Sequence, residues 1–175
     1  MKKLISFILF ACIATSFLSF TPKPKEKINW ITMQQLNEQY AKNPKPILID
    51  IYTSWCGWCK VMDSKTYTHE KLAKYVNEHY YAVKFDAESK EAITFNNKTY
   101  NFNAQYKTNE LAVYLTGGQL SYPTTVFMSG VAAQPAPLPG YMKPTEIEGP
   151  LKYFGEKADV KETFVVFDKK LRKEW

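Results

Sequence analysis

The sequence predicts an α/β fold, a β-sheet flanked by helices, in a single domain. The chain has 175 residues, which is the size of one domain with a sizeable core. Residues 47–53 form a continuous apolar run, which is typical of a central strand covered on both faces. Segments with helical spacing of apolar residues alternate with segments that favour strands, as they do in α/β proteins.

The first half of the chain contains strong local signals. Thr32 followed by Gln35 forms a capping-box pattern at a helix start, and Pro44 and Pro46 end that helix. In chain order we expect a strand at 28–30, a helix at 32–42 that buries Met33, Leu36 and Tyr40, a strand at 47–53, a helix from 56, a helix capped by Thr68 with Leu72, Val76 and His79 on one face, and a strand at 80–86.

The second half contains an insertion and a helical end. Residues 93–95 and 99–102 alternate in polarity around Asn96-Asn97-Lys98, which predicts a β-hairpin inserted within 87–122. Its role is either an ordinary surface decoration or substrate selection. Further along we expect a helix at 109–116 stopped by Gly117-Gly118, a strand at 124–128, an edge strand at 133–138, a helix from Pro144 kinked or restarted at Gly149-Pro150, and a C-terminal helix on which Val160, Phe164, Phe167 and Leu171 repeat.

The first residues have the pattern of an export signal. Met1-Lys2-Lys3 is followed by an apolar run, and Ala14-Thr15-Ser16 supplies small residues for cleavage before Phe17. An uncleaved signal anchor and a lipidated Cys12 are the alternatives. We therefore assign 1–20 to a signal peptide and leader, 21–27 to a linker and 28–175 to the folded domain, and we expect an exported protein of the periplasm or cell envelope.

Composition excludes several functions. The formal net charge is +6, but the lysines are scattered, so a nucleic-acid partner is not expected. A zinc site is not expected either, because beyond one close cysteine pair the chain offers only His69 and His79. Without Cys12, the cysteines are Cys56 and Cys59, which close too small a loop to stabilise a fold. They indicate a functional pair in a protein without metal or other cofactor, and we expect a monomer.

The chemistry of the chain centres on Trp55-Cys56-Gly57-Trp58-Cys59-Lys60, between the apolar strand and a helix. A helix N-terminus offers free N–H groups and the positive end of the dipole, which favour a thiolate. We expect Cys56 at this exposed end as the nucleophile and Cys59, one turn further, as the residue that resolves a mixed disulfide. A disulfide kept for stability alone is the alternative.

Residues 49–60 resemble the active-site segment of thioredoxin-fold proteins, and the resemblance extends over about 28–154. It is greatest to exported bacterial thioredoxin-like proteins of the Trp-Cys-Gly-Trp-Cys-Lys type. It implies a central mixed β-sheet flanked by helices, with the β-hairpin insertion placed before a cis-proline loop. The implied site residues are a buried acid, Asp50, that relays the proton of Cys59, its partner Lys84, a cis Pro123 after Tyr122, Gly140 at the far rim of a substrate groove, and Trp55 and Trp58 as contact surface.

The resemblance implies a thiol–disulfide oxidoreductase that acts on protein or peptide disulfides and thiols. The Asp50/Lys84 pair and the lack of a histidine between the cysteines favour a reductase, which needs a separate membrane or soluble electron donor. An oxidase or isomerase with the same cysteines, and a partner-binding module with little turnover, are the alternatives. Gly57-Trp58 replaces the Gly-Pro of thioredoxins, and this change affects the redox potential in a direction that the sequence does not give.

Overall fold

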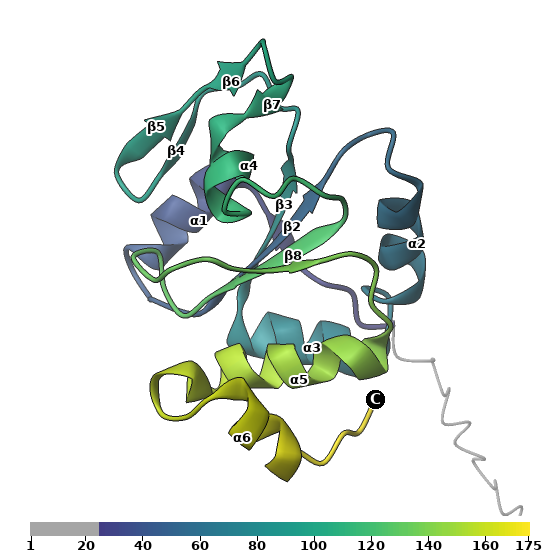
Figure 1. Ribbon diagram of the computed structural model, residues 1–175. Coiled ribbons are helices and arrows are strands. Elements are labelled where there is room, and N and C mark those ends of the chain that lie inside the picture. The colour runs from purple at the N-terminus through teal and green to yellow at the C-terminus, as the bar shows by residue number, and fades with distance from the viewer. Residues whose placement is uncertain (1–24) are drawn as a thin grey trace, which may run out of the picture.

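The computed structural model describes residues 25–175 and has an α/β architecture with one mixed sheet (Figure 1). The strands run in the order β1-β3-β2-β8-β9, where β1 is Trp30–Ile31, β3 is Tyr81–Asp86, β2 is Ile47–Tyr52, β8 is Thr124–Met128 and β9 is Ala136–Pro139. The first three are parallel, and β8 and β9 are antiparallel to their neighbours. The expected strands are thus present.

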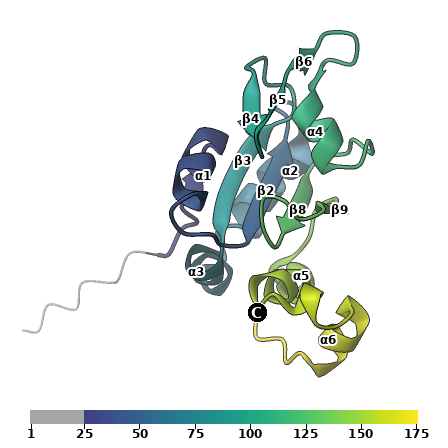
Figure 2. The ribbon, with the colours of Figure 1, turned by 90° about the vertical axis from the view of Figure 1, so that its left-hand side faces the viewer.

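Helices cover both faces of the sheet, so the apolar strand β2 is buried on both sides (Figures 1 and 2). One core contains side chains of α1 (Met33–Tyr40) and α4 (Glu110–Leu115), packed with Ile47, Ile49 and Ile51 of β2. The other contains side chains of α2 (Gly57–Lys65), α3 (Glu70–His79) and α5 (Pro144–Gly155), packed with Leu48 of β2 and Phe127 of β8. The continuous apolar run is therefore explained by a strand without a solvent-facing side.

A side-chain cap explains where α1 begins, whereas the N-cap residue of α3 makes no side-chain cap hydrogen bond. The Thr32 side chain accepts the Gln35 N–H and the Gln35 side chain accepts the Thr32 N–H, so the predicted capping box is confirmed. The prediction that Thr68 caps α3 is wrong, because His69 is the N-cap residue. The Thr68 hydroxyl instead donates to the Ser64 carbonyl, four residues back, after the end of α2.

The insertion contains two hairpins rather than the one that was expected. The predicted hairpin is present as β4 (Ile93–Phe95) and β5 (Lys98–Tyr100), joined by Asn96 and Asn97 with φ of 48° and 59°. A second pair, β6 (Phe102–Asn103) and β7 (Thr108–Asn109), follows directly and leads into α4 (Figure 1). Its strands have only two residues each, too few for an alternating pattern.

The C-terminal region differs from the expectation at two points. Helix α5 continues through Pro150 without restarting. Gly149 allows α6 (Phe164–Lys170) to lie close to α5, because a Cβ at this position would lie 2.7 Å from Asp168 Oδ1. The C-terminal helix α6 lies beside α5 (Figure 2), and Phe167 packs against Tyr153 of α5. Val160 is 73% exposed and lies before α6, in a short 3₁₀ helix at Ala158–Val160. The repeat of apolar residues therefore spans two separate elements.

The predicted signal peptide, and residues 21–24 of the predicted linker, lie outside the described residues. Between residues 25 and 175, no helix combines the length and the apolar character needed to cross a membrane.

Candidate active site

The cysteine pair lies at the start of α2, directly after the central strand. The Cys56 N–H donates to the Thr53 carbonyl (3.2 Å), which turns the chain from β2 into the helix. Cys56 is the N-cap residue, its Sγ accepts the Cys59 N–H (3.0 Å), and the two cysteines are joined by a disulfide. The position of Cys56 at a helix N-terminus agrees with the prediction, and it places this sulfur where a thiolate is stabilised by N–H groups and the helix dipole.

The expected exposure of Cys56 is not found. Cys56 and Cys59 are each only 4% exposed, whereas the flanking Trp55 and Trp58 are 65% and 62% exposed. Little of Cys56 reaches the surface because its sulfur is bonded to Cys59 and accepts a backbone N–H. The surface around the disulfide is therefore mainly aromatic.

Each of the two tryptophans packs against a tyrosine of the loops opposite. Trp55 meets Tyr122 edge-on with 5.8 Å between ring centroids, and Trp58 lies 5.5 Å from Tyr141. Tyr122 precedes Pro123 through a cis peptide bond, and Tyr141 follows Gly140.

The loops that carry these tyrosines are joined by a backbone hydrogen bond. The Gly140 N–H donates to the Pro123 carbonyl (2.8 Å), and the φ of +93° at Gly140 favours glycine. The structure thus brings together Trp55, Tyr122, Pro123 and Gly140, which the sequence singled out, and pairs Trp58 with a tyrosine that sequence reasoning missed.

Asp50 and Lys84 are neighbours in the sheet. They lie opposite each other on β2 and β3, with 3.4 Å between Lys84 Nζ and Asp50 Oδ2. Asp63 of α2, which sequence reasoning missed, lies closer to Lys84, with its two oxygens 2.5 and 2.6 Å from Nζ. The ammonium group thus bridges a buried carboxylate and a more exposed one.

A second missed residue, Tyr67, completes the surroundings of Asp50. The Tyr67 hydroxyl lies 3.3 Å from Asp50 Oδ1 and 3.0 Å from the hydroxyl of Thr125, the residue of β8 opposite Asp50. Asp50 is 1% exposed, and burial raises its pKa to about 6, although Lys84 opposes the rise. At this pKa the carboxyl group exchanges a proton near neutral pH.

Asp63 connects this acid to the cysteines. It follows Cys59 by four residues on α2, so the two side chains lie on the same face of the helix, one turn apart. The i, i+4 spacing was the available signal for Asp63. No local pattern indicated Tyr67, because its contacts with Asp50 and Thr125 join residues 17 and 58 positions apart.

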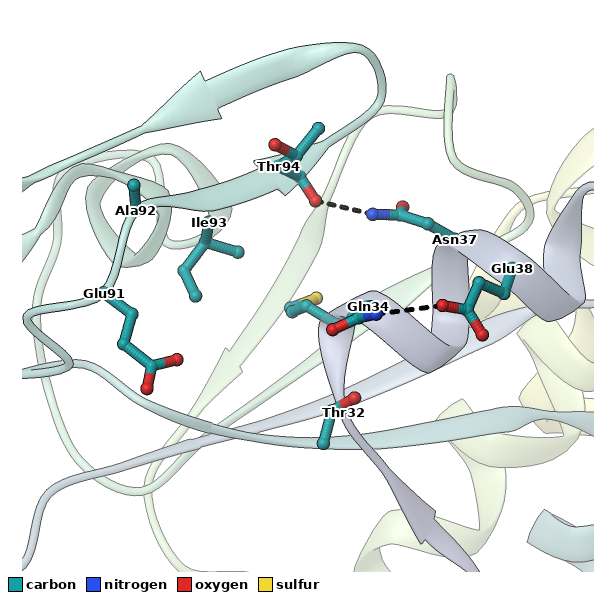
Figure 3. Close-up of a pocket in the computed structure, with 9 residues that line it drawn as sticks. Thr32, Gln34, Asn37, Glu38, Glu91, Ala92, Ile93 and Thr94 are labelled. Carbon is teal, nitrogen blue, oxygen red and sulfur yellow. Dashed lines mark hydrogen bonds between the residues drawn. The ribbon is translucent and has the colours of Figure 1, made fainter.

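Other cavities lie away from the disulfide. A pocket of about 470 Å³ lies between α1 and β4, where Asn37 donates to the Thr94 carbonyl and Gln34 to Glu38 (Figure 3). None of the site residues named above lines it. Among residues 25–175, no cluster of three or more histidine, cysteine or acidic side chains could hold a metal ion.

Comparison with known proteins places the chain in a family. A family model described as Thioredox_DsbH, "Protein of unknown function, DUF255", matches residues 15–154. The chain belongs to this family. The expected thioredoxin fold is confirmed by solved structures that are similar to this DUF255 protein. An oxidoreductase titled DsbH superposes with a TM-score of 0.54 and 16% identity, covering 79% of this chain and 92% of that one. A thioredoxin-fold protein from Helicobacter pylori has a TM-score of 0.56 and 20% identity, covering 73% and 80%.

Curated relatives match over a shorter stretch. An uncharacterized protein of Caenorhabditis elegans is 38% identical over 64 residues, which are 36% of this chain and 9% of that protein. The thiol:disulfide interchange protein DsbD of Campylobacter jejuni is 34% identical over 53 residues, 30% of this chain and 9% of DsbD. The match therefore covers less than a tenth of each of these relatives.

Proposed function

We propose that this DUF255 protein is a thiol–disulfide oxidoreductase that reduces protein disulfides outside the cytoplasm through a Cys56/Cys59 dithiol–disulfide cycle. The observation that carries the proposal is the disulfide at the N-terminus of α2, with Cys56 as N-cap residue between two exposed tryptophans. The thioredoxin fold and the similarity to a protein named for thiol:disulfide interchange support it.

The first step belongs to Cys56. In the reduced protein its thiolate attacks one sulfur of a substrate disulfide, forms a mixed disulfide and releases the other substrate sulfur as a thiolate. The first-turn N–H groups of α2 and the helix dipole stabilise the attacking Cys56 thiolate before this step. The backbone of Tyr122, next to the cis Pro123, offers a strand-like edge on which an extended substrate segment can pair.

The second step belongs to Cys59. Its thiolate attacks the Cys56 sulfur, which closes the protein disulfide and releases the second substrate thiolate, so that the substrate gains two electrons and the protein loses two. Asp50 accepts the Cys59 proton, and the raised pKa of this buried acid suits it to that exchange near neutral pH. Lys84 and Asp63 position the acid and link it to the helix that carries Cys59.

Direction and location rest on further arguments. The Asp50/Lys84 pair, and the absence of a histidine between the cysteines, favour reduction. The signal-like pattern of residues 1–20 supports export to the periplasm or cell envelope. A separate electron donor then regenerates the dithiol, and the partners are protein or peptide disulfides and thiols.

The test is the equilibrium of the protein with glutathione, combined with turnover on a peptide disulfide. A reductase has a reduction potential near the thioredoxin end of the range between about −270 and −120 mV and releases two peptide thiols per dithiol consumed. Cys56→Ser loses this turnover completely. A reduction potential of about −120 mV would indicate an oxidase instead of a reductase. If Cys56→Ser keeps the full biological effect of the protein, the protein is a binding module and not an enzyme.

A further inference from the structure

The Trp55 side of the disulfide carries two acidic residues. On the Trp55 side, Trp55 Nε1 donates to Glu88 Oε1 (3.0 Å), and the Glu88 N–H donates to Asp86 Oδ1 (2.9 Å). Among residues 25–175, no lysine, arginine or histidine nitrogen lies within 4.0 Å of either carboxylate. The exposed Trp55 indole therefore lies beside a carboxylate without a cationic partner within this distance, on a chain whose formal net charge is +6.

Glu88 is held in this place by the base of the insertion. Thr108 and Asn109, at the end of the insertion, donate to the Ala87 carbonyl from the side-chain hydroxyl (3.0 Å) and the backbone N–H (2.7 Å). These bonds tie the two ends of the insertion together next to Glu88. Since Trp55 also packs on Tyr122, the insertion, the cysteine motif and the Pro123 loop meet at one point.

The same carboxylates act on Tyr122. Burial raises the pKa of the Tyr122 hydroxyl, and the charges of Glu88 and Asp86 add to this rise. Their negative charges therefore act on Tyr122, whose backbone forms the proposed substrate-pairing edge. A cationic side chain on a substrate could contact the face of Trp55 and the Glu88 carboxylate together.

We propose that the Trp55–Glu88 side of the site selects substrates in which a lysine or arginine lies beside the reacting cysteine, with Glu88 as the specificity-determining residue. This inference rests on the proposed function. It gives the insertion a role in substrate selection, because Glu88, which provides the negative charge beside Trp55, lies at the base of the insertion. Substrates with an acidic residue at that place are disfavoured, because the Glu88 carboxylate beside Trp55 repels them and has no cationic side chain within 4.0 Å among residues 25–175.

The test compares three peptides that differ only in the residues flanking a single cysteine, which are arginine, glutamine or glutamate. Each cysteine carries the same small neutral thiol as a mixed disulfide, and stopped-flow measures its exchange with the reduced protein at low salt. Relative to the glutamine peptide, the arginine peptide should react roughly threefold to fivefold faster and the glutamate peptide slower by a similar factor. This spread should shrink as salt is added.

Flanking charges also change the pKa of the peptide cysteine, so rates measured with one protein are not sufficient. The decisive quantity is the exchange rate of the arginine peptide divided by that of the glutamate peptide, compared between the wild-type protein and Glu88→Gln. The glutamine amide keeps an oxygen that can accept the indole N–H and removes only the charge. The ratio should fall by roughly threefold or more in Glu88→Gln. It should stay unchanged in Glu70→Gln, the same charge change at an exposed residue of α3.

A ratio that Glu88→Gln leaves unchanged, or that Glu70→Gln lowers equally, overturns the inference while leaving the proposed function intact. If the glutamine peptide reacts with none of the proteins, the proposed function fails and the inference falls with it.

Discussion

Replacing Asp50 by asparagine should stabilise the oxidised protein at neutral pH. In the native protein this residue is 1% exposed and its pKa is about 6, against 3.8 for an ordinary aspartate. This gap corresponds to about 3 kcal/mol, by which the charged form destabilises the native state relative to the neutral form. The asparagine side chain would place an NH₂ group near the Lys84 ammonium group, which offsets part of this energy. The expected gain in the free energy of unfolding at pH 8 is therefore about 2 kcal/mol.

The gain should depend on pH in a defined direction. Between pH 3.8 and about 6 the unfolded chain has released the Asp50 proton while the native state still binds it. The Asp50 contribution to wild-type stability is therefore fully present below pH 3.8 and is lost as the pH rises through about 6. Asp50→Asn removes this dependence, so the difference between the two proteins should grow over that window and become constant above about pH 7.

Urea denaturation of the disulfide forms, followed by far-UV circular dichroism at pH 4 to 8, measures this difference. Glu70→Gln, an exposed carboxylate changed to an amide in the first turn of α3, is the control, and at pH 8 it should differ from wild type by much less than Asp50→Asn does. A difference between Asp50→Asn and wild type that does not change with pH would show that the native pKa of Asp50 is not raised.

The same variant separates the two chemical steps. The rate of attack by Cys56 should stay largely unchanged, whereas the rate of resolution by Cys59 should fall by about 100-fold. This is the low end of the effect of a general base, because water can partly replace Asp50 as the proton acceptor. Acid quench during reduction of a peptide disulfide should then show an accumulated mixed disulfide. If resolution keeps its wild-type rate, Asp50 has a structural role only.

Three further outcomes follow from the sequence and the structure. In the reduced protein, pH-dependent alkylation should modify Cys56 first with a thiol pKa below about 8.5, and equal rates for both cysteines would contradict its position at the helix N-terminus. Intact mass of the exported protein should place its start near Phe17, whereas a diacyl increment on Cys12 would make it a lipoprotein. Gly149→Ala should destabilise the protein by about 1 kcal/mol in urea, because the new Cβ would lie 2.7 Å from Asp168 Oδ1 and 3.4 Å from Phe164, and displacing both side chains outweighs the higher helix propensity of alanine; an unchanged or higher midpoint would show that they move at little cost.

The sequence predicts best those structural features that are caused by residues close to one another in the chain. The capping box at Thr32, the apolar run of β2 and the asparagine turn at Asn96 each act within a few residues, and each is present. Of the kink or restart expected at Gly149-Pro150, the restart does not occur. A helix-breaking signal is local, but the continuity of α5 is supported by packing against α3, β8 and α6, which lie elsewhere in the chain.

The same difference between local and long-range causes applies to the candidate site. The motif indicated Cys56 and Cys59, and the resemblance indicated Asp50 with Lys84. The i, i+4 spacing from Cys59 was the one available signal for Asp63. The roles of Tyr67 and Glu88 depend on which side chains meet across the fold, and no spacing in the sequence gives these contacts. The low exposure of Cys56 was also outside the reach of the motif, because it results from the geometry around the sulfur rather than from residue type.

Trapping the mixed disulfide tests whether Cys56 is the nucleophile of a two-cysteine cycle. Reduced Cys59→Ser and reduced Cys56→Ser are each mixed with a peptide disulfide, quenched in acid and mapped by mass spectrometry. Cys59→Ser should accumulate a stable adduct on Cys56, whereas Cys56→Ser should form little adduct on Cys59, which lies inside α2 rather than at its N-cap. Equal adducts on both variants, or an adduct on Cys59 alone, would contradict the role of Cys56 as the nucleophile.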